Sequence, residues 1–223
     1  MPCPQCDGIE RLFDVKEARH RLRKLRRTGP DRTTRMLLED VQAVLSAPDG
    51  ARCELGVVLD IGGGVGAIHH ELLERGVERA VHVDASTAYL EAARDEVERR
   101  GHGGRVEFVA GDFVQVAASI PEADIVTLDR VICCYHDMRQ LVSRSAEKAR
   151  VVYGAVYPRE SWWIRLSIAA ENLYFRVRRS PFRGYLHAPS AIDAALVAGG
   201  MQRRSRRRTL AWEVVVYTRL APG

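Results

Sequence analysis

A run of glycines stands between an apolar stretch and a predicted helix. It follows residues 57–61 and reads Gly62-Gly63-Gly64-Val65-Gly66. Glycine lets the chain turn tightly and lets its backbone approach a ligand, because no Cβ is in the way. The first turn of the following helix offers unpaired N–H groups. The spacing therefore favours a loop that binds a cofactor, and it also fits a degenerate dinucleotide fingerprint.

Acidic residues stand where the first three predicted strands end. Asp60 lies at the end of the first strand, where a carboxylate can hold a ligand ammonium group. Asp84, followed by Ala85, ends the second strand and is placed to accept hydrogen bonds from ribose hydroxyls. Asp112 and Phe113 follow the third strand, where an acid and an aromatic ring can frame an adenine. Together they predict a binding site for an adenosyl ligand.

The elements that must position these residues follow from the pattern of apolar residues. Continuous apolar runs predict strands at residues 57–61, 80–83, 106–109, 125–128 and 151–153. Helical stretches separate these runs, which is typical of a parallel sheet covered on both faces. Residues 201–209 and 211–218 are strand-like and adjacent, so we expect an antiparallel hairpin at the sheet edge.

The first fifty residues have a different character. Residues 9–28 predict a basic helix that ends at Gly29-Pro30, and a second helix with one apolar face follows. We expect residues 1–50 to form a helical cap or lid over the site, and residues 51–223 to form the cofactor-binding domain.

The glycine loop and its acids resemble the motifs of class I S-adenosylmethionine-dependent methyltransferases. The acid-x-Gly-x-Gly-x-Gly motif of that family is matched at Asp60, Gly62, Gly64 and Gly66. Asp84 and Asp112 match its next two motifs. The resemblance covers about residues 51–219. It implies an α/β, Rossmann-like fold with a seven-stranded sheet, helices on both faces and a C-terminal antiparallel hairpin. It also implies S-adenosyl-L-methionine as cofactor.

The second half of the chain is similar to magnesium-protoporphyrin O-methyltransferases, over roughly residues 124–200. That family carries a His-Tyr-Pro step after strand four, which reads Cys134-Tyr135-His136 here, and a tyrosine in its N-terminal segment, whose position Phe13 takes here. We predict His136 as the catalytic base and Tyr135 as the residue that orients the acceptor. A helix-capping role for His136 is an equally open alternative. Asp129 and Arg130 at the end of strand four are predicted to contact the cofactor.

Four further residues are candidates for holding the methyl acceptor. They are Tyr157, Arg159, Arg183 and His187. Arginines can grip an acidic group with two parallel hydrogen bonds. Trp162, Trp163 and residues 173–175 give an aromatic helical stretch, for which core packing is favoured over a cap on a flat acceptor. His69 and His70 are expected on a helix surface.

Composition excludes several classes of protein and of site. The chain has 223 residues, 46% of them hydrophobic, and a net charge of +5. It contains no apolar run long enough to span a membrane and no apolar signal core at its start, so we expect a cytoplasmic protein. Cys3 and Cys6 form a Cys-x-x-Cys pair, but a structural zinc needs four ligands and no second pair exists. We therefore expect no metal.

The predicted activity is methyl transfer to a small or medium-sized acceptor, including acidic ones, with oxygen as the favoured atom. A small molecule is the expected partner of a monomer or homodimer. Three alternatives stay open: an RNA methyltransferase, an NAD-dependent oxidoreductase, and a homologue that binds the cofactor without catalysis. The basic pI of about 9.1 is compatible with nucleic acid, but no recognisable RNA-binding module is present and a solvated arginine-rich surface is favoured.

Overall fold

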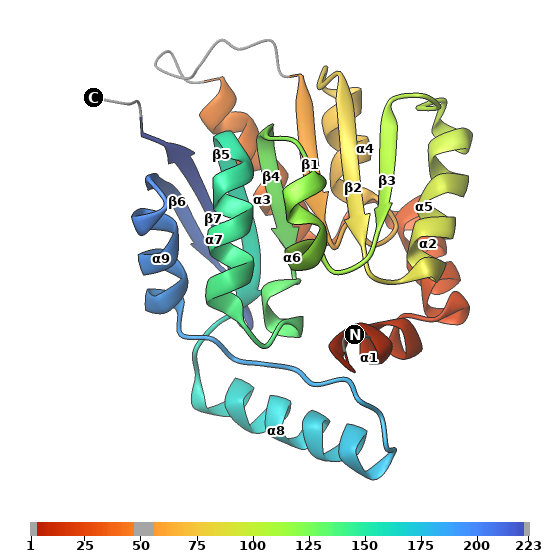
Figure 1. Cartoon of the computed structure of the whole chain (residues 1–223), viewed down its shortest axis with the longest axis vertical. Coiled ribbons are helices and arrows are strands. Elements are labelled where there is room, and N and C mark those ends of the chain that lie inside the picture. The colour runs from red at the N-terminus through yellow and green to blue at the C-terminus, as the bar shows by residue number, and fades with distance from the viewer. Residues whose placement is uncertain (1–3, 47–55, 221–223) are drawn as a thin grey trace.

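Seven strands form one mixed sheet between two layers of helices (Figure 1). The computed structural model describes residues 4–46 and 56–220. The strands are β1 (Val57–Ile61), β2 (Arg79–Asp84), β3 (Val106–Ala110), β4 (Ala123–Asp129), β5 (Ala149–Pro158), β6 (Met201–Arg208) and β7 (Trp212–Arg219). The helices are α1 (Pro4–Leu12), α2 (Val15–Thr28), α3 (Arg32–Leu45), α4 (Ala67–Glu74), α5 (Thr87–Arg100), α6 (Phe113–Val116), α7 (Met138–Lys148), α8 (Trp162–Val177) and α9 (Pro189–Ala198), with 3-10 turns η1 (Ala117–Ser119) and η2 (Ile132–Cys134).

The strand order is β3-β2-β1-β4-β5-β7-β6. Strands β1 to β5 are parallel, and β7 runs antiparallel to both β5 and β6. This confirms the predicted Rossmann-like sheet with a C-terminal hairpin. Strand β1 has β2 as its neighbour on one side and β4 on the other, so the order of the strands reverses direction at β1. Such a switch point opens a crevice at the carboxyl ends of the strands.

Consecutive residues of the central strands face opposite layers. Val58 and Ile125 pack with α3 and α4, whereas Leu59 and Val126 pack with α6, α7 and α9. All four side chains are completely buried. The continuous apolar runs in the sequence reflect this burial on both faces, because neither face of a central strand meets water.

The expected helix over residues 9–28 is two helices. Asp14 begins α2, and its side chain accepts a hydrogen bond from the Glu17 backbone N–H at 2.9 Å. A carboxylate at this position satisfies an otherwise unpaired amide of the first turn. The buried face of α2 then packs against α5 through Leu22, Leu25 and Tyr89.

Helix α3 packs against the sheet. Leu37 and Val41 are buried against β5 and β7. Arg207 on β6 donates hydrogen bonds to Glu39 and Asp40, at 2.8 and 3.0 Å. The expected domain boundary near residue 50 lies outside the described residues.

Helix α8 stands apart from the rest of the fold, beyond the carboxyl edge of the sheet (Figure 1). The expectation of core packing for its aromatic residues is wrong for Trp162 and Tyr174, which are 77% and 59% exposed. In the described part of the chain, no helix has the length and apolar character needed to cross a membrane.

Candidate functional site

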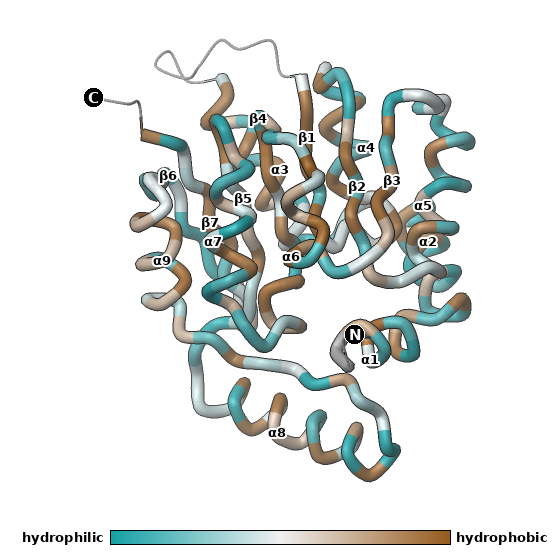
Figure 2. The backbone as a smooth tube through the Cα atoms, viewed as in Figure 1, coloured by the Kyte–Doolittle hydropathy of each residue, from teal (hydrophilic) through white to brown (hydrophobic). Residues whose placement is uncertain are grey.

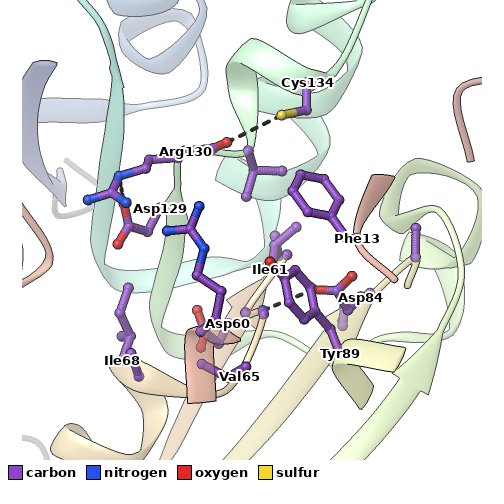
Figure 3. A pocket seen from close by; sticks show the side chains of 18 of the residues that line it. Phe13, Asp60, Ile61, Val65, Ile68, Asp84, Tyr89, Asp129, Arg130 and Cys134 are labelled. Atoms are coloured by element: carbon purple, nitrogen blue, oxygen red, sulfur yellow. Dashed lines mark hydrogen bonds and ion pairs between the residues drawn. The ribbon is translucent and has the colours of Figure 1, made fainter. Parts of the chain in front are cut away.

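A cavity of about 260 Å³ opens at the carboxyl ends of the parallel strands (Figure 3). The glycine loop forms one wall, and the ends of β2, β3 and β4 form the next. The remaining wall comes from α1, α2 and the start of α3. The cavity therefore joins the predicted cofactor residues to the N-terminal segment. Its lining includes Asp60, Gly62, Gly63, Gly64, Asp84, Ala85, Asp112, Phe113, Asp129, Arg130 and Tyr135 from the predicted set.

The glycine loop lies directly on a layer of buried side chains. A Cβ on Gly63 would come within 2.7 Å of both the Asp60 carboxylate and the His82 ring. A Cβ on Gly66, which precedes α4 with a φ of +85°, would come within 2.6 Å of the His69 ring. Both positions need glycine because backbone and side chains approach too closely for any other residue. Gly66 supports the loop from outside the cavity lining.

That buried layer is built from Asp60, His69 and His82. The Nδ1 atom of His69 lies 3.2 Å from Asp60 Oδ2 and 3.3 Å from His82 Nδ1. The other Asp60 oxygen accepts a hydrogen bond from the Thr127 hydroxyl at 2.9 Å. Burial raises the pKa of Asp60 and lowers the pKa of each of the two histidines to about 3. Because burial disfavours charge, both rings are neutral at physiological pH.

The expectation of a surface position for His69 and His70 is wrong. Both rings are fully buried, and His70 contacts His102 across 2.9 Å between Nδ1 atoms. Asp60, His69 and His82 also place one ligand atom each within 4.8 Å of one another, which is close enough to hold a metal ion. No sequence spacing signals this trio, because β1, β2 and α4 meet only in the folded chain.

We expect these histidines to make the protein sensitive to acid. The unfolded chain takes up their protons near pH 6.5, whereas His69 and His82 in the folded chain do so only near pH 3. Protons therefore favour unfolding, so the free energy of unfolding should fall below pH 6.5, by up to about 1.4 kcal/mol per pH unit for each histidine. Denaturant titrations between pH 4 and 8 measure this slope. His82→Leu should flatten it and His20→Gln, at an exposed position, should not. If the free energy of unfolding depended on pH as strongly in His82→Leu as in the unaltered chain, the acid sensitivity would not come from His82.

Asp84 holds the glycine loop against the end of β2. Its Oδ2 atom accepts from the Gly64 backbone N–H at 2.9 Å, and its Oδ1 from Ser86 N–H at 2.8 Å. Burial raises the pKa of Asp84 to about 6 although these hydrogen bonds oppose the shift. A carboxylate has about four acceptor positions, and the backbone amides of Gly64, Ser86 and Ala85 use three of them, so one remains for a ligand at this wall of the cavity.

Asp112 and Tyr135 form a pair at the end of β3. The Tyr135 hydroxyl donates to Asp112 Oδ2 at 2.9 Å, while Asp112 Oδ1 accepts from Val114 N–H and begins α6. Tyr135 is buried and lines the cavity. Its hydroxyl therefore lies on the Asp112 side of the cavity, where the sequence predicts the adenine.

Asp129 and Arg130 connect the end of β4 to the N-terminal segment. Asp129 Oδ2 accepts from the Thr34 hydroxyl, and Arg130 donates to Asp31 at 3.0 Å and to Thr33 at 2.6 Å. Arg130 has a φ of +64°, a left-handed conformation that is rare for a residue with a side chain. Within the described residues, Asp129 Oδ1 is buried and accepts no hydrogen bond, and burial raises the pKa of Asp129.

The remaining predicted site residues do not line the cavity. His136 is exposed, and its ring stacks on Tyr135. Asp137, the next residue, is the one that caps α7. The predicted acceptor residues are held elsewhere: Tyr157 donates to Glu213 at 3.4 Å, Arg159 to the Thr209 carbonyl at 3.0 Å, Arg183 to the Ser180 carbonyl at 2.7 Å, and His187 to the Tyr135 carbonyl at 2.9 Å.

Two of the cavity residues from the N-terminal helices, Arg21 and Lys24, were not predicted from the sequence, whereas the family resemblance had pointed to Phe13. Phe13, Arg21 and Lys24 line the cavity from the end of α1 and from α2. Phe13 also stacks on Tyr89, another lining residue, at 5.3 Å between ring centroids. The available signal was their spacing, since residues three or four apart share one face of a helix.

Comparison with known proteins gives the class of this fold. Residues 58–152 match the family model described as "Methyltransferase domain". Over 83 residues the chain is 37% identical to the 3-amino-4-hydroxybenzoate 4-O-methyltransferase of Streptomyces cremeus. That match covers 36% of this chain and 22% of the relative.

Two solved structures have the same fold over nearly the whole chain. Magnesium protoporphyrin IX methyltransferase from Synechocystis PCC 6803, with bound SAH, superposes with a TM-score of 0.70 at 18% identity and covers 95% of this chain and 98% of its own. An O-methyltransferase family protein from Burkholderia thailandensis superposes with a TM-score of 0.66 at 19% sequence identity. The superposition covers 95% of this chain and 62% of that protein. The fold is therefore that of class I S-adenosylmethionine-dependent methyltransferases, and the match to the methyltransferase family model lies within it, over residues 58–152.

Proposed function

We propose that this chain transfers a methyl group from S-adenosylmethionine to a small acceptor molecule. The main support for the proposal is that the glycine loop, Asp84 and Asp112 line one cavity at the switch point of the sheet. A methyl acceptor must reach the same cavity, since methyl transfer is a direct displacement on the cofactor's sulfonium.

The residues present fit the adenosyl half of this cofactor. Asp84 keeps an acceptor position for a ribose hydroxyl and is held in place by the backbone of Gly64, Ala85 and Ser86. Asp112 carries hydrogen bonds from Val114, Gln115 and Tyr135, which leaves one acceptor position for the amino group of an adenine. Phe113 and Ala85 line the space between these acids.

The methionine half fits the opposite end of the cavity. The buried Oδ1 atom of Asp129 accepts no hydrogen bond within the described chain and can accept one from an ammonium group. Asp60, predicted for the same role, already accepts from Thr127 and contacts His69. Arg21 and Lys24 supply cations for a carboxylate. We therefore assign the ammonium contact to Asp129 and a supporting role under the loop to Asp60.

The acceptor side of the cavity is mostly apolar. Ile9, Phe13, Val131 and Cys134 line it, with Arg130 nearby. This lining favours a small aromatic acceptor, and the cations allow an acidic substituent on it. Transfer to oxygen is supported by the hydroxybenzoate O-methyltransferase among the relatives. The chain's own contribution is alignment of the acceptor oxygen and exclusion of water, which can supply most of the rate.

Calorimetry tests the proposal directly. S-adenosylhomocysteine should bind with one-to-one stoichiometry, and NAD should give negligible heat. Transfer of labelled methyl groups to a panel of phenols and aromatic acids then identifies the acceptor class. Tighter binding of NAD than of S-adenosylhomocysteine would overturn the proposal, as would methylation of RNA in preference to every small acceptor.

Tyr135 and His136 should behave oppositely when substituted. Tyr135→Phe removes the hydrogen bond to Asp112, so the dissociation constant of S-adenosylhomocysteine should rise about tenfold. His136→Ala changes an exposed residue outside the cavity, so turnover should stay within about twofold. Steady-state kinetics with calorimetry measures both. A hundredfold loss of turnover in His136→Ala would restore His136 as the base.

We also propose that α1 and α2 form the lid that the sequence predicts, without α3. Amide hydrogen exchange should slow in α1 and α2 when S-adenosylhomocysteine binds, because both helices line the cavity. The buried half of α3 should be protected with and without ligand, since Leu37 and Val41 pack on the sheet. Equal exchange in α1 and α2 in both states would remove the lid role.

A further inference from the structure

The outward face of α8 carries a stripe of large apolar side chains. Trp162, Leu166, Leu173 and Val177 are 77%, 63%, 59% and 74% exposed. Their spacings of four, seven and four residues place them on one side of a helix. Among the residues of α8, Ile164 alone is classed as buried. Exposed apolar side chains gathered in this way mark an interaction surface.

The opposite face of α8 packs on the segment that follows the helix, between α8 and α9. Asn172 donates to the Gly184 carbonyl and accepts from the Gly184 N–H, both at 2.8 Å. Phe175 packs edge-on against Phe182, whose ring in turn meets Phe13 at the cavity. The apolar stripe is therefore held outward by contacts on the other side of the helix, and Figure 2 shows α8 beyond the carboxyl edge of the sheet.

Positive charge surrounds the stripe. Four arginines in or next to α8 are exposed, namely Arg165, Arg176, Arg178 and Arg179. The same stretch contains only two acidic residues, Glu160 and Glu171. Arg165 pairs with Glu160 at 3.3 Å. In the part of the chain that the structure describes, the other three arginines form no ion pair. A second copy of this face would bring like charges together, whereas an anionic surface would be attracted to it.

We propose that α8 docks this protein on the surface of an anionic lipid bilayer. The helix lies in the plane of the membrane, with the stripe of Trp162, Leu166, Leu173 and Val177 in the boundary between headgroups and acyl chains. The exposed rings of Trp162 and Tyr174 suit that boundary because each has an apolar body and a polar tip. Arg176, Arg178 and Arg179 contact the anionic headgroups. This inference does not depend on the proposed methyl transfer.

Co-sedimentation of the full chain with lipid vesicles tests the apolar part. The protein should pellet with vesicles of phosphatidylcholine and phosphatidylglycerol, and much less with phosphatidylcholine alone. The double variant Leu166→Gln and Leu173→Gln should weaken binding at least about tenfold, because two exposed leucines that would enter the bilayer are lost. The matched control is Val197→Gln with Leu210→Gln, at positions 55% and 80% exposed on α9 and the β6–β7 turn, which should bind as the unaltered chain does.

A second pair of variants tests the charge. Replacing Arg176, Arg178 and Arg179 by glutamine should weaken binding to the anionic vesicles by about fivefold per arginine at low salt. Replacing Arg19, Arg23 and Arg27 on the exposed side of α2 removes the same charge elsewhere and should have little effect. A circular dichroism spectrum and a melting temperature that are unchanged in all four variants show that each one folds.

Three results would overturn the proposal. The first is equal pelleting with both kinds of vesicle or with neither. The second is a loss of binding as large in the two control variants as in the α8 variants. The third is a dimer in analytical ultracentrifugation that the Leu166→Gln and Leu173→Gln variant dissociates, without vesicle binding, which would assign the stripe to a second copy of this chain.

Discussion

Replacing Gly63 by alanine should raise the dissociation constant of S-adenosylhomocysteine about a hundredfold. The added Cβ would lie 2.7 Å from Asp60 Oδ2 and from two atoms of the His82 ring. These groups are fully buried and fixed by Thr127 and His69, so they cannot move aside cheaply. Overpacking of this kind costs up to about 3 kcal/mol, and here the loop that faces the ligand must give way. Calorimetry at pH 7.5 measures the loss.

The matched control for this prediction is Gly103→Ala. A Cβ at Gly103 meets nothing closer than 3.6 Å, and the residue lies far from the cavity lining in the turn after α5. Its affinity for S-adenosylhomocysteine and its melting temperature should match those of the unaltered chain. Equal affinity in Gly63→Ala and Gly103→Ala would show that the loop does not contact the cofactor in the way proposed.

Asp84→Ala should lower the affinity for S-adenosylhomocysteine by about 10-fold to 150-fold. This range corresponds to about 1.5–3 kcal/mol for hydrogen bonds made to a charged group. The effect should also depend on pH. Burial raises the pKa of Asp84 to about 6. The carboxyl group is therefore ionised above pH 7 and becomes protonated as the pH falls through 6. Affinity should therefore be flat from pH 7 to 8 and should weaken below 6, by at most about tenfold per pH unit.

The pH profile separates a ribose contact from general damage to the loop. In Asp84→Ala the affinity for S-adenosylhomocysteine should be lower and should no longer change between pH 5 and 7. Asp95→Ala, an exposed acid on α5, should keep both the affinity and the profile of the unaltered chain. A profile that persists in Asp84→Ala would assign the titration to another group and would contradict the ribose contact.

The cavity wall around the glycine loop was predictable because its signals are local. Gly62 to Gly66, Asp84 and Asp112 each follow a strand directly, and the carboxyl ends of parallel strands meet at one edge of a sheet. The strands themselves were predictable from continuous apolar runs, since burial on both faces removes polar residues from a strand. The same reasoning placed the C-terminal hairpin correctly, where two strands follow each other without a helix.

The acceptor side was less predictable because it depends on how distant segments pack. The prediction for His136 assumed that the chain continues along the cavity after β4. Instead, the turn η2 and the extended residue Tyr135 direct His136 to solvent. Arg21 and Lys24 were expected on a basic helix, but only the packing of α2 on α5 decides which of its faces meets the cavity. His69 and His82 depend in the same way on the contact between α4 and β2.

The packing of α3 on β5, β6 and β7 constrains the order in which the protein can fold during synthesis. Leu37 and Val41 leave the ribosome early, yet the strands that cover them come from residues 149–158 and 201–219. The hydrogen bonds of Arg207 with Glu39 and Asp40 join positions 168 and 167 residues apart. Until residues 149–158 and 201–219 have been synthesised, α3 can pack on α4 and β1, but the part of its apolar face that β5 and β7 cover stays exposed. Contacts between such distant segments slow folding, so the nascent chain should expose apolar surface for longer than one in which neighbouring segments pack together.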